Sequence, residues 1–295
     1  MAKENLVLLH GRVKETPRIF RLQDGTLTKG MFTLEVVRRP RSSAGNYSQG
    51  HRFDCPVIMT RDPKFMTRSL GQPIAGAISD LKQGDLCDVR GVLSTREIIK
   101  SSICPCCGHK NEKEGNIVYV TPLYICRRET DLPEEEAKEL LKMRNEVSNI
   151  CMVIGTLCRE VMHYKDEKKR AYAEYQLAVN RKYRVKEDPE NVKTDYPWVK
   201  AFGKQALKDV ECLSVNSVVY INGALQTRPV NRTTICEHCG EAYQWEDKVA
   251  TEIVPYSTEY LANCKVPQAE EDGLDSDFES PLDLEEDYEE NQSIT

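Results

Sequence analysis

Two short motifs hold cysteines at the spacing of metal ligands. Residues 104–109 read Cys-Pro-Cys-Cys-Gly-His, and residues 236–240 read Cys-Glu-His-Cys-Gly. Two residues between the cysteines let both thiolates reach one ion, and the glycine permits a tight turn behind them. A redox-active pair is the alternative, but such pairs stand at the start of a helix, which an inserted loop between strands does not provide. We predict that the motifs bind zinc through Cys104, Cys107, Cys236 and Cys239.

Zinc takes four ligands, and each motif supplies one pair of cysteines. Either the two pairs share one ion, or each site is completed locally. Local completion would use Cys126 or His109 at the first motif and His238 or Cys264 at the second. We favour the shared site, because identical placement of the two pairs gives four cysteines without further ligands. A shared ion would clamp the two segments together and contribute to folding.

The remaining cysteines are interpreted through the compartment. The chain has 12 cysteines, begins Met-Ala-Lys-Glu-Asn without the apolar run of a signal peptide, and lacks a membrane-length apolar stretch. We therefore expect a soluble cytoplasmic protein with reduced thiols rather than a disulfide scaffold. Most other cysteines have apolar neighbours and are predicted to be small buried residues: Cys55, Cys87, Cys151, Cys158 and Cys212.

The sequence repeats itself with an offset of 132 residues. Residues 84–96 align with residues 216–228, and further upstream residues 32–39 resemble residues 175–182. The residues that recur are Gly91, Thr95, Arg96, Cys104, Cys107 and Gly108, matched by Gly223, Thr227, Arg228, Cys236, Cys239 and Gly240. Six identities at one offset indicate two copies of one structural unit.

Each copy is predicted to be mainly β. Short runs of Val, Ile, Leu, Tyr and Thr alternate with polar residues and are broken by Gly, Pro, Asn and Asp. A Pro followed by three Glu predicts a connecting helix over about 133–146. The expected organisation is a first repeat over 1–130, a helical linker over 131–146, a second repeat over 147–265, and a disordered acidic tail over 266–295.

The charge is divided between the body and the tail. The chain has a net charge of -6, but residues 269–295 contain twelve Asp or Glu and no Lys or Arg. Removing that segment leaves 35 acidic against 41 basic residues, a body of about +6. A mildly basic body with an acidic tail favours a polyanion-binding protein, although a charge run by itself is also typical of a solvated segment.

Basic and aromatic residues alternate after the third predicted strand of each repeat. Cations that follow phosphates and rings on which bases stack are what sequence-independent binding of a single strand requires. In the first repeat the candidates are Arg38, Arg39, Arg41, Tyr47, Arg52, Phe53 and Arg96. In the second they are Arg181, Lys182, Tyr183, Arg184, Tyr196, Trp198, Lys200, Phe202 and Arg228. For the rings the alternative is a place in the core, and Tyr243 and Trp245 contact either DNA or the second cysteine motif.

A family resemblance rests on an ordered series in the second repeat. The series comprises Ile154-Gly-Thr-Leu, Tyr175-Gln-Leu-Ala-Val-Asn, Trp198-Val-Lys-Ala-Phe-Gly-Lys, residues 218–228 and Thr251-Glu-Ile-Val. Together these segments resemble the bacterial single-stranded DNA-binding protein family. The resemblance implies two tandem OB-fold barrels, and the cysteine motifs then form a zinc-knuckle insertion between the fourth and fifth strands of each. It also places Phe202 at a family stacking position, with Tyr183 and Tyr196 near two others.

The departures from the family pattern bear on assembly and partners. The family usually assembles four single folds, so a tandem chain implies a homodimer with four folds or a monomer with two. Typical members lack the cysteine motifs. The chain ends in Asn-Gln-Ser-Ile-Thr rather than in the family's hydrophobic tip. Recruitment of replication or recombination proteins through the acidic tail would then use an internal segment such as residues 277–282.

The sequence thus predicts a non-catalytic protein that coats single-stranded DNA in replication, recombination or repair, with zinc as its cofactor and no contact with a membrane. One alternative is an OB-fold scaffold that binds proteins. The other is a zinc-dependent nucleic-acid enzyme, but the cysteine pairs are typical of a closed structural site.

Overall fold

The computed structural model describes residues 3–40, 51–62, 64–65, 78–130, 132–165, 171–182 and 194–265. Residues 1–265 form one compact unit, and the expected acidic tail lies outside the described residues. Most described residues belong to strands, which confirms the mainly β prediction. None of the helices in the described parts of the chain has the length and apolar character needed to span a bilayer.

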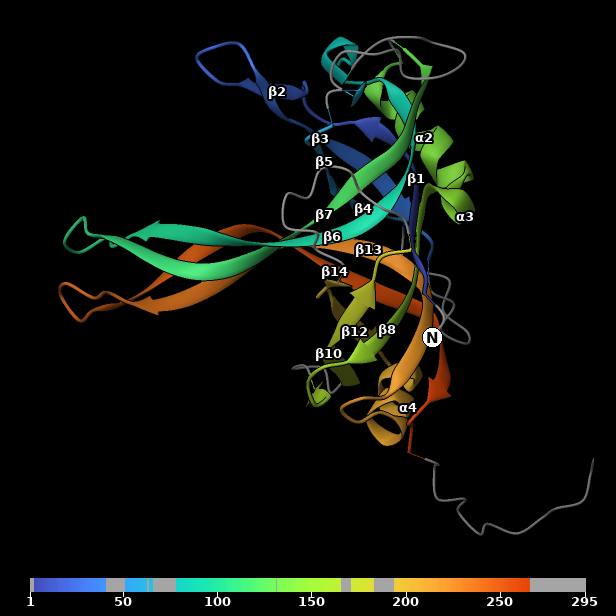
Figure 1. Ribbon diagram of the computed structural model, residues 1–295, viewed down its shortest axis with the longest axis vertical. Helices are drawn as coiled ribbons and strands as arrows, with labels where there is room; N and C mark the ends of the chain where they lie inside the picture. The colour runs from blue at the N-terminus through green and yellow to red at the C-terminus, as the bar shows by residue number, and fades with distance from the viewer. Residues whose placement is uncertain are drawn as a thin grey trace, which may run out of the picture. The chain divides into compact units, whose positions relative to one another are not determined.

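The two repeats form two halves with matching strands, labelled in Figure 1. The first half contains β1 (Asn5–Val13), β2 (Arg18–Arg21), β3 (Leu27–Arg38), β4 (Arg52–Asp54), β5 (Val57–Thr60), η1 (Ile78–Asp80), β6 (Leu86–Ile103) and β7 (Lys110–Glu129). The second contains β8 (Asn149–Leu157), β9 (Met162–Lys165), β10 (Ala171–Asn180), β11 (Thr194–Asp195), β12 (Trp198–Phe202), α4 (Lys204–Cys212), β13 (Val218–Ile235) and β14 (Ala242–Ala262). Helices α2 (Glu134–Met143) and α3 (Asn145–Ser148) connect the halves, where the sequence predicts a helix.

Strand pairing closes on itself in each half. In the first half, β1 pairs with β3 and β6, β3 pairs with β5, and β7 pairs with both β5 and β6. The same cycle joins β8, β10, β12, β14 and β13 in the second half. In the first cycle β6 pairs with β1, and in the second β13 pairs with β8. Closure suits the alternating sequence, because it places one face of every strand on a common core.

The two halves join through their first strands. Strands β1 and β8 run antiparallel, with Val7 opposite Cys151 at the centre and Asn5 opposite Val153 on one side. In β8 alternate residues are buried, from Asn149 to Leu157, whereas β1 alternates only at its start and is buried from Leu9 to Val13. This pairing makes one continuous sheet from the two cycles, so the halves share backbone hydrogen bonds and a continuous apolar core.

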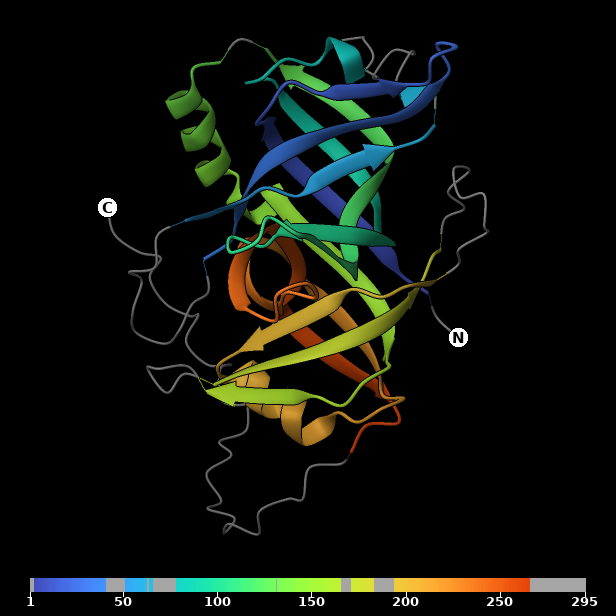
Figure 2. The same cartoon turned by 90° about the vertical axis from the view of Figure 1, so that its left-hand side faces the viewer.

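Helix α2 covers a second, smaller apolar cluster on the first half. Its buried residues Ala137 and Leu141 pack with Val37 and Leu86. Three acidic residues occupy its first turn, which suits the positive end of the helix dipole. In Figure 2 the helix lies along one flank of the first half, next to the place where the chain passes to the second.

One recurring pair of glycines, Gly91 and Gly223, stands where two strands approach each other too closely for a side chain. A Cβ on Gly91 would lie 2.5 Å from the carbonyl oxygen of Thr121, and one on Gly223 would lie 2.4 Å from that of Val254. Both glycines sit at a register shift in their hairpin, which is the mark of a β-bulge. The repeat of Gly at this offset is therefore a packing requirement.

Candidate nucleic-acid interface and metal centre

The outer parts of β6–β7 and β13–β14 form two long hairpins that lie side by side and extend away from both halves (Figure 1). The cysteine motifs occupy the two tips. The Sγ atoms of Cys104, Cys107, Cys236 and Cys239 all lie within 4.8 Å of one another. The distances are 3.7 Å between Cys104 and Cys239 and 3.6 Å between Cys107 and Cys236. Two sulfurs in a disulfide lie about 2.05 Å apart, so these are free thiols.

This geometry fits one tetrahedral ion. Four sulfurs at the usual Zn–S distance of about 2.3 Å are separated by about 3.8 Å, close to both measured separations. The sulfur positions therefore bring the two cysteine pairs together, as a shared site would require, with each hairpin contributing two thiols. The side chains considered for local completion lie outside the group of four, and two of them, His109 and His238, stack on each other with centroids 5.5 Å apart.

The two tips have the same backbone turn. Gly108 donates its N–H to the carbonyl of Cys104, and Gly240 donates its N–H to the carbonyl of Cys236. Both donor–acceptor distances are 2.9 Å. Both glycines have positive φ, 73° and 75°, a region that residues with a Cβ rarely adopt. The glycine of the motif is thus required by the turn that presents the thiols.

A small polar and apolar cluster supports the cysteines. The Tyr243 hydroxyl lies 2.6 Å from the Ser102 hydroxyl and accepts a bond from the Asn111 amide at 3.0 Å. The same amide lies 3.6 Å from the Sγ of Cys236. Tyr243 is buried against the cysteines with Trp245 packed beside it. Both rings therefore pack at the second cysteine motif, as one of the two alternatives from the sequence has it.

Within the cluster, the Cys236 thiol ionises more readily than the Cys239 thiol. Although burial opposes ionisation, hydrogen bonds from the Cys239 backbone and the Asn111 amide lower the pKa of Cys236 to about 5. The Glu241 backbone bond favours ionisation of Cys239, but burial and the three neighbouring cysteines together raise its pKa to about 12. Four thiolates at this separation therefore need a cation to offset their mutual repulsion.

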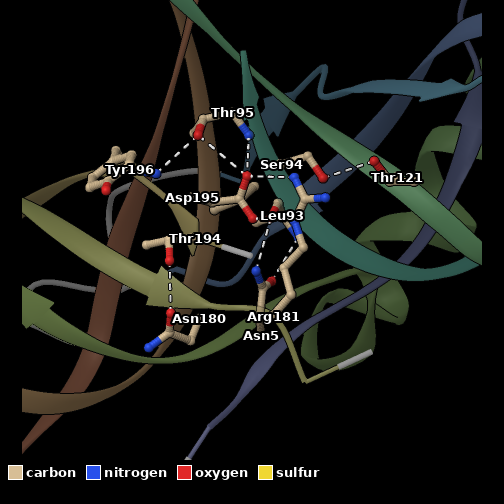
Figure 3. A network of polar contacts seen from close by, with 10 residues as sticks. All are labelled: Asn5, Leu93, Ser94, Thr95, Thr121, Asn180, Arg181, Thr194, Asp195 and Tyr196. Carbon is tan, nitrogen blue, oxygen red and sulfur yellow. Dashed lines mark hydrogen bonds and ion pairs between the residues drawn. The ribbon is translucent and has the colours of Figure 1, made fainter. Parts of the chain in front are cut away.

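Two predicted binding residues have an internal role instead. The Arg181 guanidinium is 6% exposed and donates to the fully buried Asp195 carboxylate at 2.6 and 2.8 Å (Figure 3). Arg38 makes the equivalent pair with Asp54 at 3.0 Å and is 11% exposed. Burial next to a carboxylate keeps both arginines from an open phosphate-binding surface. The sequence interpretation is corrected here, because a basic run at a strand end does not show which side chains turn inward.

Other predicted residues also have partners within the chain. Phe53 packs against the apolar cluster under α2. Arg39 pairs with Glu146 at 2.8 Å and lies over the Tyr256 ring. Lys182 pairs with Glu4 at 3.0 Å. Arg52 is exposed on β4, and four candidates lie outside the described residues: Arg41, Tyr47, Tyr183 and Arg184.

Strand β12 brings three predicted residues to one outward face. Trp198, Lys200 and Phe202 alternate with buried Val199 and Ala201, so the strand period places all three on the side away from the core. The Arg159 guanidinium lies 5.9 Å from the centroid of the Trp198 ring. Tyr196, just before the strand, is 46% exposed.

Two further rings on this face were missed from the sequence. Tyr172 lies directly opposite Phe202 and also opposite Tyr164, so three neighbouring strands each contribute a ring. Tyr164 and Tyr172 stack with centroids 5.0 Å apart, Phe202 follows at 6.4 Å, and Lys200 lies 4.3 Å above Tyr172. The signal was available: Tyr175 is a core residue, and three positions earlier on a strand is the opposite face.

The two recurring arginines differ in their surroundings. Arg228 pairs with Glu252 at 2.7 Å and is 37% exposed. Arg96 is exposed and lines a shallow pocket with Thr28, Lys29 and Arg61. The recurring arginine therefore has a different local environment in each half.

Comparison with known proteins places these features in context. Residues 148–244 match the sequence profile described as the single-strand binding protein family. The chain resembles that family. The resemblance drawn from the second repeat is thereby confirmed for this segment, which is a third of the chain and covers the face of β12. No curated protein matches the sequence.

Solved structures show the same fold. Wild-type single-stranded DNA binding protein from Thermus aquaticus is similar with a TM-score of 0.55 at 16% identity, over 91% of this chain and 98% of that one. A deletion mutant of the same protein gives a TM-score of 0.53 at 18% identity, over 92% of this chain and 100% of that one. Both halves are included, so the likeness in fold extends beyond the segment matched by the profile.

Proposed function

We propose that this protein binds single-stranded DNA without sequence preference, through two OB-fold units formed by the closed strand cycles, and that it performs no catalysis. The observation that carries the proposal is the aromatic ladder of Tyr164, Tyr172 and Phe202 with Lys200 over its centre. It lies on the segment that matches the single-strand binding protein family. Rings in register across strands offer stacking faces to successive bases, each worth about 1–3 kcal/mol.

The basic residues near the ladder would hold the backbone of the bound strand. Lys200 and Arg228 each have a carboxylate partner, Glu174 and Glu252, on the same face. A phosphate can take the place of such a carboxylate, and the exchange makes binding sensitive to salt. The candidates outside the described residues remain part of the proposal: Arg41, Tyr47, Tyr183 and Arg184.

We further propose that the metal is zinc, one ion for each chain. The ion would be a structural clamp, since all four ligands are cysteines and no position is left for water or substrate. It would hold the two hairpins, and so the two halves, in a fixed orientation. Its role in DNA binding would be indirect.

Coating of single strands would serve replication, recombination or repair in the cytoplasm. A homodimer would supply four OB folds, two from each chain.

The acidic segment 269–295 would recruit proteins of that machinery and compete with DNA for basic surfaces. If the tail competes, its deletion should raise DNA affinity at low salt, as measured by fluorescence anisotropy; unchanged affinity would contradict competition.

Oligothymidine titration tests the main proposal. The full chain should bind at low salt with quenching of tryptophan fluorescence from Trp198, and Phe202→Leu should weaken binding about tenfold or more, because it removes a stacking face. The control is Tyr124→Leu, which removes an exposed ring on β7 of the first half, outside the ladder, and should keep the quench. Absence of binding by the wild-type chain at low salt would refute the function.

A further inference from the structure

The outward faces of the two halves can be compared residue by residue. Phe32 on β3 and Tyr175 on β10 are equivalent buried core residues. Three positions before each stand Lys29 and Tyr172, both on the outward face. At the position where the second half has its central ring, the first half therefore has a lysine.

Strand β2, which pairs with β3, corresponds in the same way to β9, which pairs with β10. Phe20 on β2 pairs with Lys29, as Tyr164 on β9 pairs with Tyr172. The Lys29 Nζ lies 4.2 Å from the centroid of the Phe20 ring. That contact fixes the ammonium group over the ring, at the place where the second half stacks two tyrosines.

On the other side of β3, a cation again takes the place of an aromatic ring. Gly30 pairs with Thr60 as Ala173 pairs with Ala201, so the next residue along is Arg61 in the first half and Phe202 in the second. Arg61, Lys29, Arg96 and Thr28 line one shallow pocket. Three cations therefore converge where the second half presents aromatic faces.

The carboxylate that pairs with the recurring arginine in the second half is missing in the first. Glu252 lies opposite Gln226 on β13. The corresponding pair in the first half is Ser94 opposite Tyr119. None of the described residues that line the pocket is acidic, whereas Arg228 in the second half is paired with Glu252.

We propose that this pocket binds the phosphodiester backbone of the strand, and that the two halves divide the contacts: the first holds phosphates and the second stacks bases. The inference rests on the proposed binding of single-stranded DNA and assigns phosphate contacts to Lys29, Arg61 and Arg96. Three donors around a shallow depression suit the oxygens of a phosphate, whereas the ladder suits the faces of bases.

Two double variants separate the two roles. Lys29→Gln with Arg96→Gln should weaken binding of oligothymidine and of an abasic oligonucleotide by the same factor, about tenfold or more. It should also lower the salt slope by about 1.4, because each single-strand phosphate contact contributes about 0.7. Tyr164→Leu with Tyr172→Leu should weaken oligothymidine binding about tenfold, with abasic binding and salt slope unchanged.

Separate control variants test for a general effect of charge and for a loss of folding. Lys82→Gln with Lys113→Gln removes the same charge from exposed positions outside the pocket and should alter the salt slope by less than half as much. Tyr172→Phe should retain binding if stacking is the role. A pocket variant with the slope of the charge control, or a ladder variant that weakens abasic binding equally, overturns the division of contacts. Failure of the wild-type chain to bind either oligonucleotide instead overturns the proposed function.

Discussion

Asp195 in the second half accepts the backbone N–H of Thr95 in the first half at 2.7 Å (Figure 3). Asp54 accepts the N–H of Thr227 at 2.8 Å, which is the same contact in the opposite direction. Each aspartate is also held by an arginine of its own half. The recurring threonines thus add a reciprocal pair of contacts between the halves to the pairing of β1 with β8, which gives a reason for their presence at the repeat offset.

Replacing Asp195 should test this connection. Asp195→Asn leaves the Arg181 guanidinium buried without a countercharge, and breaking a buried pair costs about 3–5 kcal/mol. We expect that loss in the free energy of unfolding, measured by urea denaturation, and a similar loss for Asp54→Asn. Glu15→Gln is the control, since its pair with Arg18 is largely exposed and should contribute less than about 1 kcal/mol. Equal effects of Asp195→Asn and the control would contradict the assignment.

The cysteine cluster predicts the metal content. Native mass spectrometry of the full chain should show one zinc, and a chelator should lower the midpoint of thermal unfolding, because binding of a structural ion contributes to folding. Cys236→Ser should abolish stoichiometric zinc. Cys158→Ser is the control, because this cysteine lies away from the hairpin tips and outside the group of four thiols. Two ions for each chain would argue for separate sites.

The close approach of β13 and β14 predicts a position-specific effect of a single methyl group. In Gly223→Ala the new Cβ would meet backbone 2.4 Å away, so the strands must separate, at a cost of about 1–3 kcal/mol. Gly115→Ala should cost less, because the added Cβ meets only the flexible Lys100 side chain at 3.0 Å. Urea denaturation of both variants measures the difference, and the reverse order would exclude this packing explanation.

Asp209 predicts a pH dependence of stability. Burial raises the pKa of its carboxyl, against hydrogen bonds from Tyr260, Gln205 and Tyr175. An aspartate in the unfolded chain titrates near 3.9. Since the folded state binds the proton more tightly, this contribution is complete below about pH 4 and is lost as pH rises through the folded pKa.

Asp209→Asn has no carboxyl to ionise. The free energy of unfolding of the wild-type chain should therefore fall relative to that of the variant between about pH 4 and pH 7. Urea denaturation at several pH values in this range gives the difference, with all other carboxyls common to both proteins. A difference that is constant, or that changes in the opposite direction, would show that burial does not govern Asp209.

Of the five cysteines predicted to be buried, Cys87, Cys151 and Cys212 are buried, Cys55 is half-buried and Cys158 is exposed. Apolar neighbours in sequence do not decide this, because neighbouring residues on a strand face opposite sides. The same ambiguity explains Tyr172, which was overlooked beside the core residue Tyr175. Local composition predicts that a segment is a strand more reliably than which of its residues reach the surface.

Residue type, period and spacing along the chain were enough to predict the repeat, the mainly β character, the four cysteines and the resemblance of the second repeat to single-strand binding proteins. They could not predict that the four thiols meet at one point, that Arg38 and Arg181 turn inward, or that Lys29 stands where the second half has Tyr172. These relationships join residues far apart in sequence, so they depend on strand register and on the pairing of β1 with β8.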